Sequence, residues 1–180
     1  MGRSSPSGGN EPQSAATGRL GRAAIGERLA GFIYGTIVVL SVLIVGARAF
    51  PDDAGEIAVM VLVTSAVFWL AHVYAHALAH SVSHDEHLSW VELRRIAGRE
   101  ASVVEAAVPP LVALLLGALE LFSTSAAVWT AFVLGLVVLG AQGIVFARFE
   151  RLGMTATIGV VAANLGLGLV LVGLKVLVTH

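Results

Sequence analysis

Five long apolar stretches determine what this chain can fold into. They cover residues 31–49, 56–82, 102–122, 126–147 and 155–178. About 20 apolar residues in an α-helix cross the ~30 Å hydrocarbon layer of a bilayer. A helix also satisfies its own backbone hydrogen bonds where no water can do so. The pattern predicts an all-α fold, a polytopic membrane helix bundle of about five transmembrane helices.

The composition supports a membrane protein and narrows its partners. Of the 180 residues, 57% are hydrophobic and only 13% are charged, which lies outside the range of soluble domains. A net charge of −1, without a basic stripe interleaved with aromatic residues, gives no reason to expect a nucleic-acid partner. Cysteine is absent, so disulfides and thiolate metal sites are excluded. The expected partner is the lipid bilayer.

Residues 1–29 differ in composition from everything that follows. They are rich in Gly, Ser, Pro and Arg, and such a segment buries too little apolar surface to offset its ordering entropy. We expect a disordered cytoplasmic tail over residues 1–29, with a short helical lead-in from Ala23. The transmembrane bundle then occupies residues 30–180.

The basic residues predict how the chain is oriented, because short loops rich in Lys and Arg stay on the cytoplasmic side. A cytoplasmic N-terminus places nine of the eleven basic residues inside, and only Arg48 and Lys175 outside. The nine are Arg3, Arg19, Arg22, Arg28, Arg94, Arg95, Arg99, Arg148 and Arg151. With five spans in the plasma membrane, the C-terminal His180 would then lie outside the cell.

Five of the six histidines lie between residues 72 and 87. His72, His76, His80 and His84 are spaced four apart, so they follow one helical face with a rise of about 6 Å per step. We call this series the histidine ladder. Imidazole can accept and donate a proton near neutral pH, and ionisable groups within a bilayer usually face a cavity or a partner.

Depth divides the ladder into two parts. His72 and His76 should lie within the hydrocarbon layer, where they are candidates for a polar path, with Tyr74 assisting and Gln142 and Asn164 contributing from the last two spans. The other histidines should approach the cytoplasmic interface, where solvated side chains are the simpler interpretation. A metal site at this mouth is a less favoured alternative, with His80, His84 and His87 as its candidate ligands.

Other polar and small residues within the spans have structural interpretations. Glu120 and Lys175 should lie at similar depth near the outer face and form an ion pair. Single amides such as Gln142 and Asn164 commonly hydrogen-bond between helices, and glycines in the last two spans favour close packing within or between protomers. The sequence therefore leaves open whether the protein forms a homo-oligomer. Pro109 and Pro110 predict a kink near residues 105–110.

Four segments carry a resemblance to a known family. The stretches "ERLAGFIYGTIVVLSVL", "FWLAHVYAHALAH", "VVEAAVPPLVALLLGAL" and "VGLKVLVTH" look like those of a family of small, uncharacterised bacterial integral membrane proteins. The resemblance covers nearly everything after residue 26 and implies a polytopic bundle, but no activity. The first two spans also weakly resemble a bacterial and lysosomal potassium-channel family. That family's Phe-Ser-Asp signature is replaced here by Phe32-Ile33-Tyr34-Gly35.

Two functions from different classes fit these observations. The first is a small channel or transporter for a cation, in particular the proton, with His72 and His76 lining the path. The alternative is a non-transporting interaction or structural subunit, whose histidines and amides only specify helix packing. We expect neither an enzyme nor a cofactor, because no nucleophile with a base and an orienting group can be assembled from the sequence.

Overall fold

In the computed structural model every described element is an α-helix, as the apolar pattern predicts. The structure describes the backbone of residues 11–84 and 89–179, and the side chains of these residues except 11–20, 22–23, 82–84, 171–172 and 174–179. The helices in chain order are α1 (Glu11–Ala49), α2 (Ala54–His84), α3 (Trp90–Arg99), α4 (Ser102–Glu105), α5 (Val108–Ala118), α6 (Thr124–Phe149) and α7 (Met154–Thr179).

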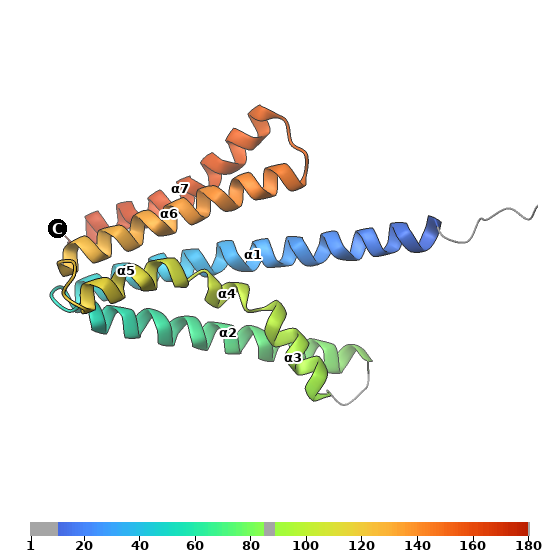
Figure 1. Cartoon of the computed structure of the whole chain (residues 1–180), viewed down its shortest axis with the longest axis horizontal. Coiled ribbons are helices and arrows are strands. Elements are labelled where there is room, and N and C mark those ends of the chain that lie inside the picture. Colours follow the sequence, from blue (N-terminus) through green and yellow to red (C-terminus); the bar gives the residue numbers. More distant parts are fainter. Residues whose placement is uncertain (1–10, 85–88, 180) are drawn as a thin grey trace, which may run out of the picture.

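The long helices run back and forth along one axis, with α1 between the α2 side and the α6–α7 hairpin (Figure 1). The start of α1, the end of α2, α3 and the α6–α7 turn lie at one end of the bundle. We call this the basic end, because Arg28, Arg94, Arg95, Arg99, Arg148 and Arg151 belong to it. The α1–α2 and α5–α6 turns lie at the opposite, acidic end, which carries Asp52, Asp53, Glu56 and Glu120.

Three helical segments are long and apolar enough to cross a membrane: Ala24–Ala49, Ala54–Ser81 and Thr124–Phe149. A fourth crossing is obtained if the bent pair Trp90–Glu105 and Val108–Ala118 counts as one span. In α7 the apolar segment with described side chains is the shorter Met154–Val170. The structure thus supports three to four spans by length and composition, and the expected count of five stays a prediction.

The predicted kink is present. The segments on either side of residues 106–107 meet at 54°, and Pro109 and Pro110 occupy the first turn of α5. Proline is well tolerated there, because the first N–H groups of a helix have no intrahelical acceptor. The prolines therefore begin a new helix after the break and prevent the earlier one from continuing.

The α3 helix lies in the charged stretch between the second and third apolar segments, where a loop was expected. Ser89 Oγ accepts a hydrogen bond from Glu92 N at 3.2 Å, and Ser89 N donates to Glu92 Oε2 at 3.1 Å. This reciprocal pair is a capping box, and the spacing Ser-x-x-Glu in "SWVE" is its sequence signature. The hydrogen bonds from the Ser89 backbone and hydroxyl hold the pKa of Glu92 below its usual value.

Small residues let α1 approach the bent segment closely. A Cβ on Gly31 would lie 2.5 Å from Ser102 Oγ, and one on Gly35 would lie 2.6 Å from the Val103 carbonyl oxygen. The two glycines are four apart, which is the Gly-x-x-x-Gly spacing of close helix packing in membranes. On the acidic-end side of this contact, buried apolar residues from α1, α2, α5 and α6 form the core, including Leu40, Leu43, Ile57, Leu114 and Phe132.

The first helix begins earlier than expected. Residues 11–29 belong to α1, whereas a disordered tail was expected there with a helical lead-in only from Ala23. The segment contains many Ala, Arg, Leu and Glu residues, which are strong helix formers. The boundary between tail and bundle at residue 30 therefore lies inside a continuous helix, and residues 1–10 lie outside the described part of the chain.

Candidate functional site

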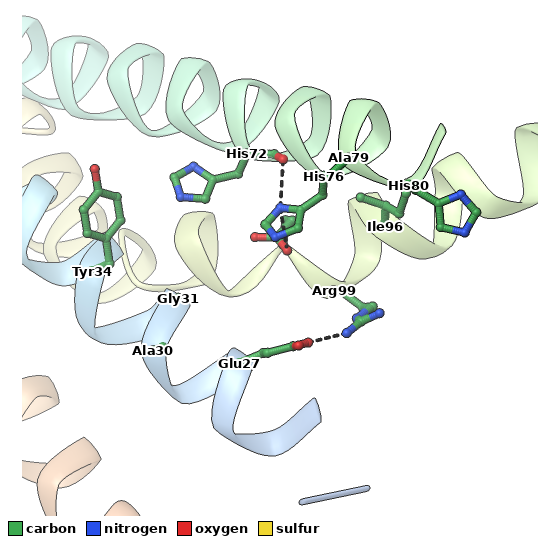
Figure 2. Close-up of a pocket in the computed structure, with 11 residues that line it drawn as sticks. Glu27, Ala30, Gly31, Tyr34, His72, His76, Ala79, His80, Ile96 and Arg99 are labelled. Carbon is green, nitrogen blue, oxygen red and sulfur yellow. Dashed lines mark hydrogen bonds and ion pairs between the residues drawn. The ribbon is translucent and has the colours of Figure 1, made fainter. Parts of the chain in front are cut away.

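A pocket of about 560 Å³ lies between α1, α2 and α3 at the basic end (Figure 2). Its polar lining combines three histidines of α2 with charged groups of α1 and α3. The lining residues are Glu27, Ala30, Gly31, Tyr34, His72, His76, Ala79, His80, Ile96, Arg99 and Glu100. The volume falls within the range of small-molecule sites, and the lining places ionisable side chains from three helices around one space.

His72 and His76 are both oriented by the backbone of their own helix. His72 Nδ1 lies 2.9 Å from the Phe68 carbonyl oxygen, and His76 Nδ1 lies 3.0 Å from the His72 carbonyl oxygen. A carbonyl can only accept, so each Nδ1 carries hydrogen and donates. In the neutral ring Nε2 is then the acceptor, the nitrogen that can take up a second proton.

Two contacts connect these histidines to other helices. The His72 ring lies 5.5 Å from the Tyr34 ring of α1, measured between centroids. His76 Nδ1 lies 3.4 Å from Glu100 Oε1, which closes an ion pair when the imidazole is protonated. The Glu100 side chain is only 18% exposed, so its carboxylate is poorly solvated. A protonated His76 would balance its charge.

The α1 helix is joined to the bent segment by two further ion pairs. Arg99 donates to Glu27 at the rim of the pocket, and Arg28 Nη2 donates to Glu105 Oε2 at 3.0 Å. Trp69 Nε1 donates to the Ala97 carbonyl oxygen at 3.1 Å and thereby ties α3 to α2. With neutral histidines the charged groups of the pocket sum to −1, from two glutamates and one arginine.

The structure separates the residues that were predicted to form one polar path. His72 and His76 line the pocket, but Tyr74 of the same helix is 68% exposed and is not part of the lining. Two residues advance a helix by about 200°, so Tyr74 faces away from the histidines. Asn164 Nδ2 donates to the Leu139 carbonyl oxygen at 3.3 Å, which makes it a contact between α7 and α6. Gln142 lies on α6, and its buried Oε1 has no hydrogen-bond partner within the described residues.

The remaining predicted sites fall partly outside the described residues. Glu120 is exposed and adopts a positive φ of 60° at the end of α5, but the Lys175 side chain is not described, so their ion pair is untested. His80 lines the pocket, whereas the His84 side chain and all of His87 lie outside the described part. Over residues that the structure does describe, no group of three or more His, Asp or Glu side chains is arranged to hold a metal ion.

Comparisons of the chain with protein-family models, with curated proteins and with solved structures found no match. The functional proposal therefore depends on the chemistry of these side chains alone.

Sequence reasoning found the histidines but missed their partners. Tyr34 and Glu27 belong to α1, and Arg99 and Glu100 lie at the end of α3. These helices directly precede and follow α2 in the chain, but only their packing brings these side chains beside the histidines. The Gly-x-x-x-Gly spacing at Gly31 and Gly35 was the available signal that α1 packs closely beside this region. Chemically, the pocket can accept protons on its imidazoles or hold a small cation against its carboxylates.

Proposed function

We propose that the protein is a multi-pass membrane protein that transports a small cation, most simply the proton, with the histidine pocket as the basic-end half of its path. The observation that supports this is the gathering of His72, His76 and His80 around one cavity that also holds Glu100. Proton relay needs groups that accept and donate in turn, and imidazoles with an oriented Nδ1 and an accepting Nε2 meet that requirement.

The order of groups along α2 suggests a direction of entry. His80 lies nearest the basic end, His76 comes next beside Glu100, and His72 lies deepest beside the Tyr34 ring. From His80 to His72 the rise is about 12 Å, a substantial part of the way through one leaflet. A proton entering at the basic end would therefore meet a carboxylate-paired imidazole before it reaches the deepest one.

Beyond the pocket, an apolar layer favours a transporter or a gated channel over an open pore. Val39, Leu40 and Leu43 follow Tyr34 along α1 toward the acidic end, and all three are buried. Ions do not cross such a layer without rearrangement, so a second conformation must open it. Helices broken beside a charged pocket are typical of secondary transporters, and the break before α5 is the candidate hinge.

The alternative is a non-transporting interaction or structural subunit, and one feature favours it. Gly159 and Gly166 of α7 have no atom within 4 Å of where a Cβ would lie, so this helix presents small residues that could pack against another protein. The family resemblance noted above stays a prediction and supports either function equally.

Proton flux into liposomes that contain the purified protein separates the two functions. His72→Phe and His76→Phe keep an aromatic ring but remove the relay nitrogens, so we expect each to lower flux roughly tenfold or more. Tyr74→Phe is the matched control on the same helix, and we expect wild-type flux because its side chain faces away from the pocket. Absence of wild-type flux between about pH 5 and 8, or unchanged flux in both histidine variants, would leave the subunit as the better proposal.

The transport path also needs a topology, and we propose five spans in the plasma membrane with the N-terminus in the cytoplasm and the C-terminus outside. The native chain has no cysteine, so single cysteines can be introduced without background. A membrane-impermeant maleimide added to intact cells should label Ser123→Cys at the acidic end but not Gly153→Cys at the basic end. Labelling of Gly153→Cys alone would show that the orientation is the reverse of the proposed one.

A further inference from the structure

The α3 helix has an outward face that takes no part in the histidine pocket. We call it the α3 outer face, and it consists of Trp90, Val91, Arg94, Arg95 and Gly98, all of them exposed. These positions fall within an arc of about 140° on a helical projection. Of the pocket residues, Ile96 lies on the other side of the same helix, Arg99 lies beside the edge of the face, and Glu100 follows the last residue of α3.

The face is held in a fixed position beside the end of a membrane-spanning segment. The apolar span of α2 ends at Ser81, and α3 packs back against α2 through the hydrogen bond from Trp69 to the Ala97 carbonyl oxygen. The capping box of Ser89 and Glu92 fixes the start of α3. If this span crosses the bilayer, the first turn of α3 lies just beyond the end of the span, near the depth where hydrocarbon gives way to headgroups.

The chemistry of the α3 outer face matches that depth. Trp90 and Val91 are 67% and 69% exposed, a large apolar surface for a helix whose other exposed residues are mostly arginines. Tryptophan is enriched at membrane interfaces because its ring is apolar and its N–H is polar. The Arg94 guanidinium carbon lies 5.7 Å from the Trp90 ring centroid, so the cation stays beside the aromatic anchor.

The charge on this face is of one sign. Arg94 and Arg95 are exposed, while the acidic residue of α3, Glu92, lies outside this face and accepts hydrogen bonds from Ser89. Neither arginine is in an ion pair with any residue that the structure describes. Guanidinium groups bind phosphate oxygens through two parallel hydrogen bonds, so this face is complementary to anionic phosphate groups.

We propose that the α3 outer face is a binding surface for anionic phospholipid headgroups of the leaflet at the basic end, with Trp90 inserted among the lipids and Arg94 and Arg95 holding the phosphates. This inference goes beyond the transport proposal and does not depend on it. It assigns a partner to a helix in the charged stretch between two apolar segments.

The test measures which lipids stay bound to the full-length protein. Protein purified from bilayers with equal amounts of phosphatidylglycerol and phosphatidylcholine is analysed by native mass spectrometry, and the ratio of the two retained lipids is determined. The double variant Arg94→Gln/Arg95→Gln should lower the preference for phosphatidylglycerol by roughly tenfold to thirtyfold, since each surface cation contributes about 1 kcal/mol toward anionic lipid. Arg94→Lys/Arg95→Lys should keep much of it.

The matched control is Arg148→Gln/Arg151→Gln, which removes the same charge from the α6–α7 turn at the same end. It should change the lipid ratio little. An equal loss in both double variants would overturn the proposal, because lipid preference would then follow total charge and not the α3 outer face.

A second measurement does not depend on how any arginine variant folds. Tryptophan fluorescence is recorded in bilayers that contain brominated lipids, which quench only rings in contact with acyl chains. The difference between the wild-type signal and that of Trp90→Phe is the fluorescence of Trp90. We expect brominated lipids to quench this fluorescence. If it is unquenched, Trp90 stands in water and the proposal is wrong.

Discussion

The two ends of the bundle are held together by different kinds of contact. At the basic end, side chains join helices through His76 and Glu100, Arg28 and Glu105, and Glu27 and Arg99. At the acidic end, caps and backbone hydrogen bonds close the turns. Asp53 Oδ1 accepts from Gly55 N at 2.9 Å and from Glu56 N at 3.0 Å to cap α2.

The α5–α6 turn at the acidic end is built in the same way. Glu120 adopts the left-handed conformation, and Leu121 N donates to the Leu116 carbonyl oxygen at 3.0 Å, as in a Schellman motif. Ser123 Oγ then caps α6 by accepting from Ala126 N at 3.3 Å. A cavity of about 490 Å³ opens here and is lined by Asp52, Asp53 and Glu120 among others. Its lining residues belong to the two turns and the helix ends beside them.

The two kinds of contact respond differently to salt concentration and to pH. Ion pairs between exposed side chains weaken with salt and with protonation of their carboxylates, and the pair of His76 and Glu100 requires a protonated imidazole. Hydrogen bonds between backbone groups contain no titratable group. Both ends hold titratable groups, since the Asp53 carboxylate caps α2 at the acidic end. Among the described residues, it is at the basic end that such groups form ion pairs between one helix and another. Proton uptake at the basic end, as proposed above, would therefore act directly on contacts between helices.

The largest expected effect tests whether the basic end depends on close backbone packing in addition to charge. Gly35→Ala would place a Cβ 2.6 Å from the Val103 carbonyl oxygen and 3.0 Å from Val103 Cα, both backbone atoms that cannot rotate away. Overpacking of this kind typically costs about 1–3 kcal/mol. Thermal unfolding in detergent should show a lower stability for Gly35→Ala.

Gly159→Ala provides the control for this substitution, because nothing lies within 4 Å of the added Cβ. Alanine favours a helix interior over glycine by about 1 kcal/mol, so the stability of Gly159→Ala should be unchanged or higher. If Gly35→Ala is as stable as Gly159→Ala, then α1 and α4 do not approach as closely as described, and charge alone holds the basic end.

The contrast between the ends also shows what the sequence could predict. The apolar stretches predicted the long helices, and Pro109 with Pro110 predicted the bend, because both signals act locally along the chain. The capping box at Ser89 and Glu92 is equally local and could have revealed α3. The acidic-end turns contain no glycine at the left-handed position, so their geometry at Glu120 had no local signal.

The pocket was harder to predict, because it depends on which faces of distant helices meet. Spacing of four placed His72 and His76 on one face, but the rotation of α2 about its axis was unknown. His80 was expected near the cytoplasmic interface, apart from the polar path, and the structure places it in the lining of the same pocket as His72. Tyr74 was included because it is close in sequence, whereas Tyr34 is the tyrosine that lies beside the histidines.

A smaller effect is expected from the ion pair of Arg28 and Glu105, whose side chains are 60% and 46% exposed. A double-mutant cycle with Arg28→Gln and Glu105→Gln should give a coupling of less than about 1 kcal/mol. The coupling should decrease further when salt is raised, because exposed charges are screened. Thermal unfolding in detergent at low and high salt measures both quantities.

A neutral hydrogen bond at the acidic end is the matched control for salt. Thr124 Oγ1 donates to the Asp52 carbonyl oxygen at 3.1 Å, and Thr124→Val removes this bond without changing charge. Its effect on stability should be the same at both salt concentrations. The proposed difference between the ends fails if Thr124→Val shows the same salt dependence as the Arg28 and Glu105 cycle.

The smallest expected effect concerns the first turn of α3 and its dependence on pH. Hydrogen bonds from Ser89 lower the folded-state pKa of Glu92 below its usual 4.5, so the capping box stabilises the helix most when the carboxylate is charged. That stabilisation is fully present above the unfolded value and is lost as pH falls through the lowered folded value. Hydrogen exchange at the first amides of α3 should therefore be slow at neutral pH. On acidification its rate should rise by more than the intrinsic pH dependence of exchange.

Glu92→Gln keeps the hydrogen-bond acceptor but cannot titrate, so its exchange should follow the intrinsic dependence alone. The capped amide of Ala126 in α6 has a hydroxyl as its acceptor, and it should likewise show no extra acid-induced opening. Equal acid sensitivity of the two caps would mean that the Glu92 carboxylate does not control the first turn of α3.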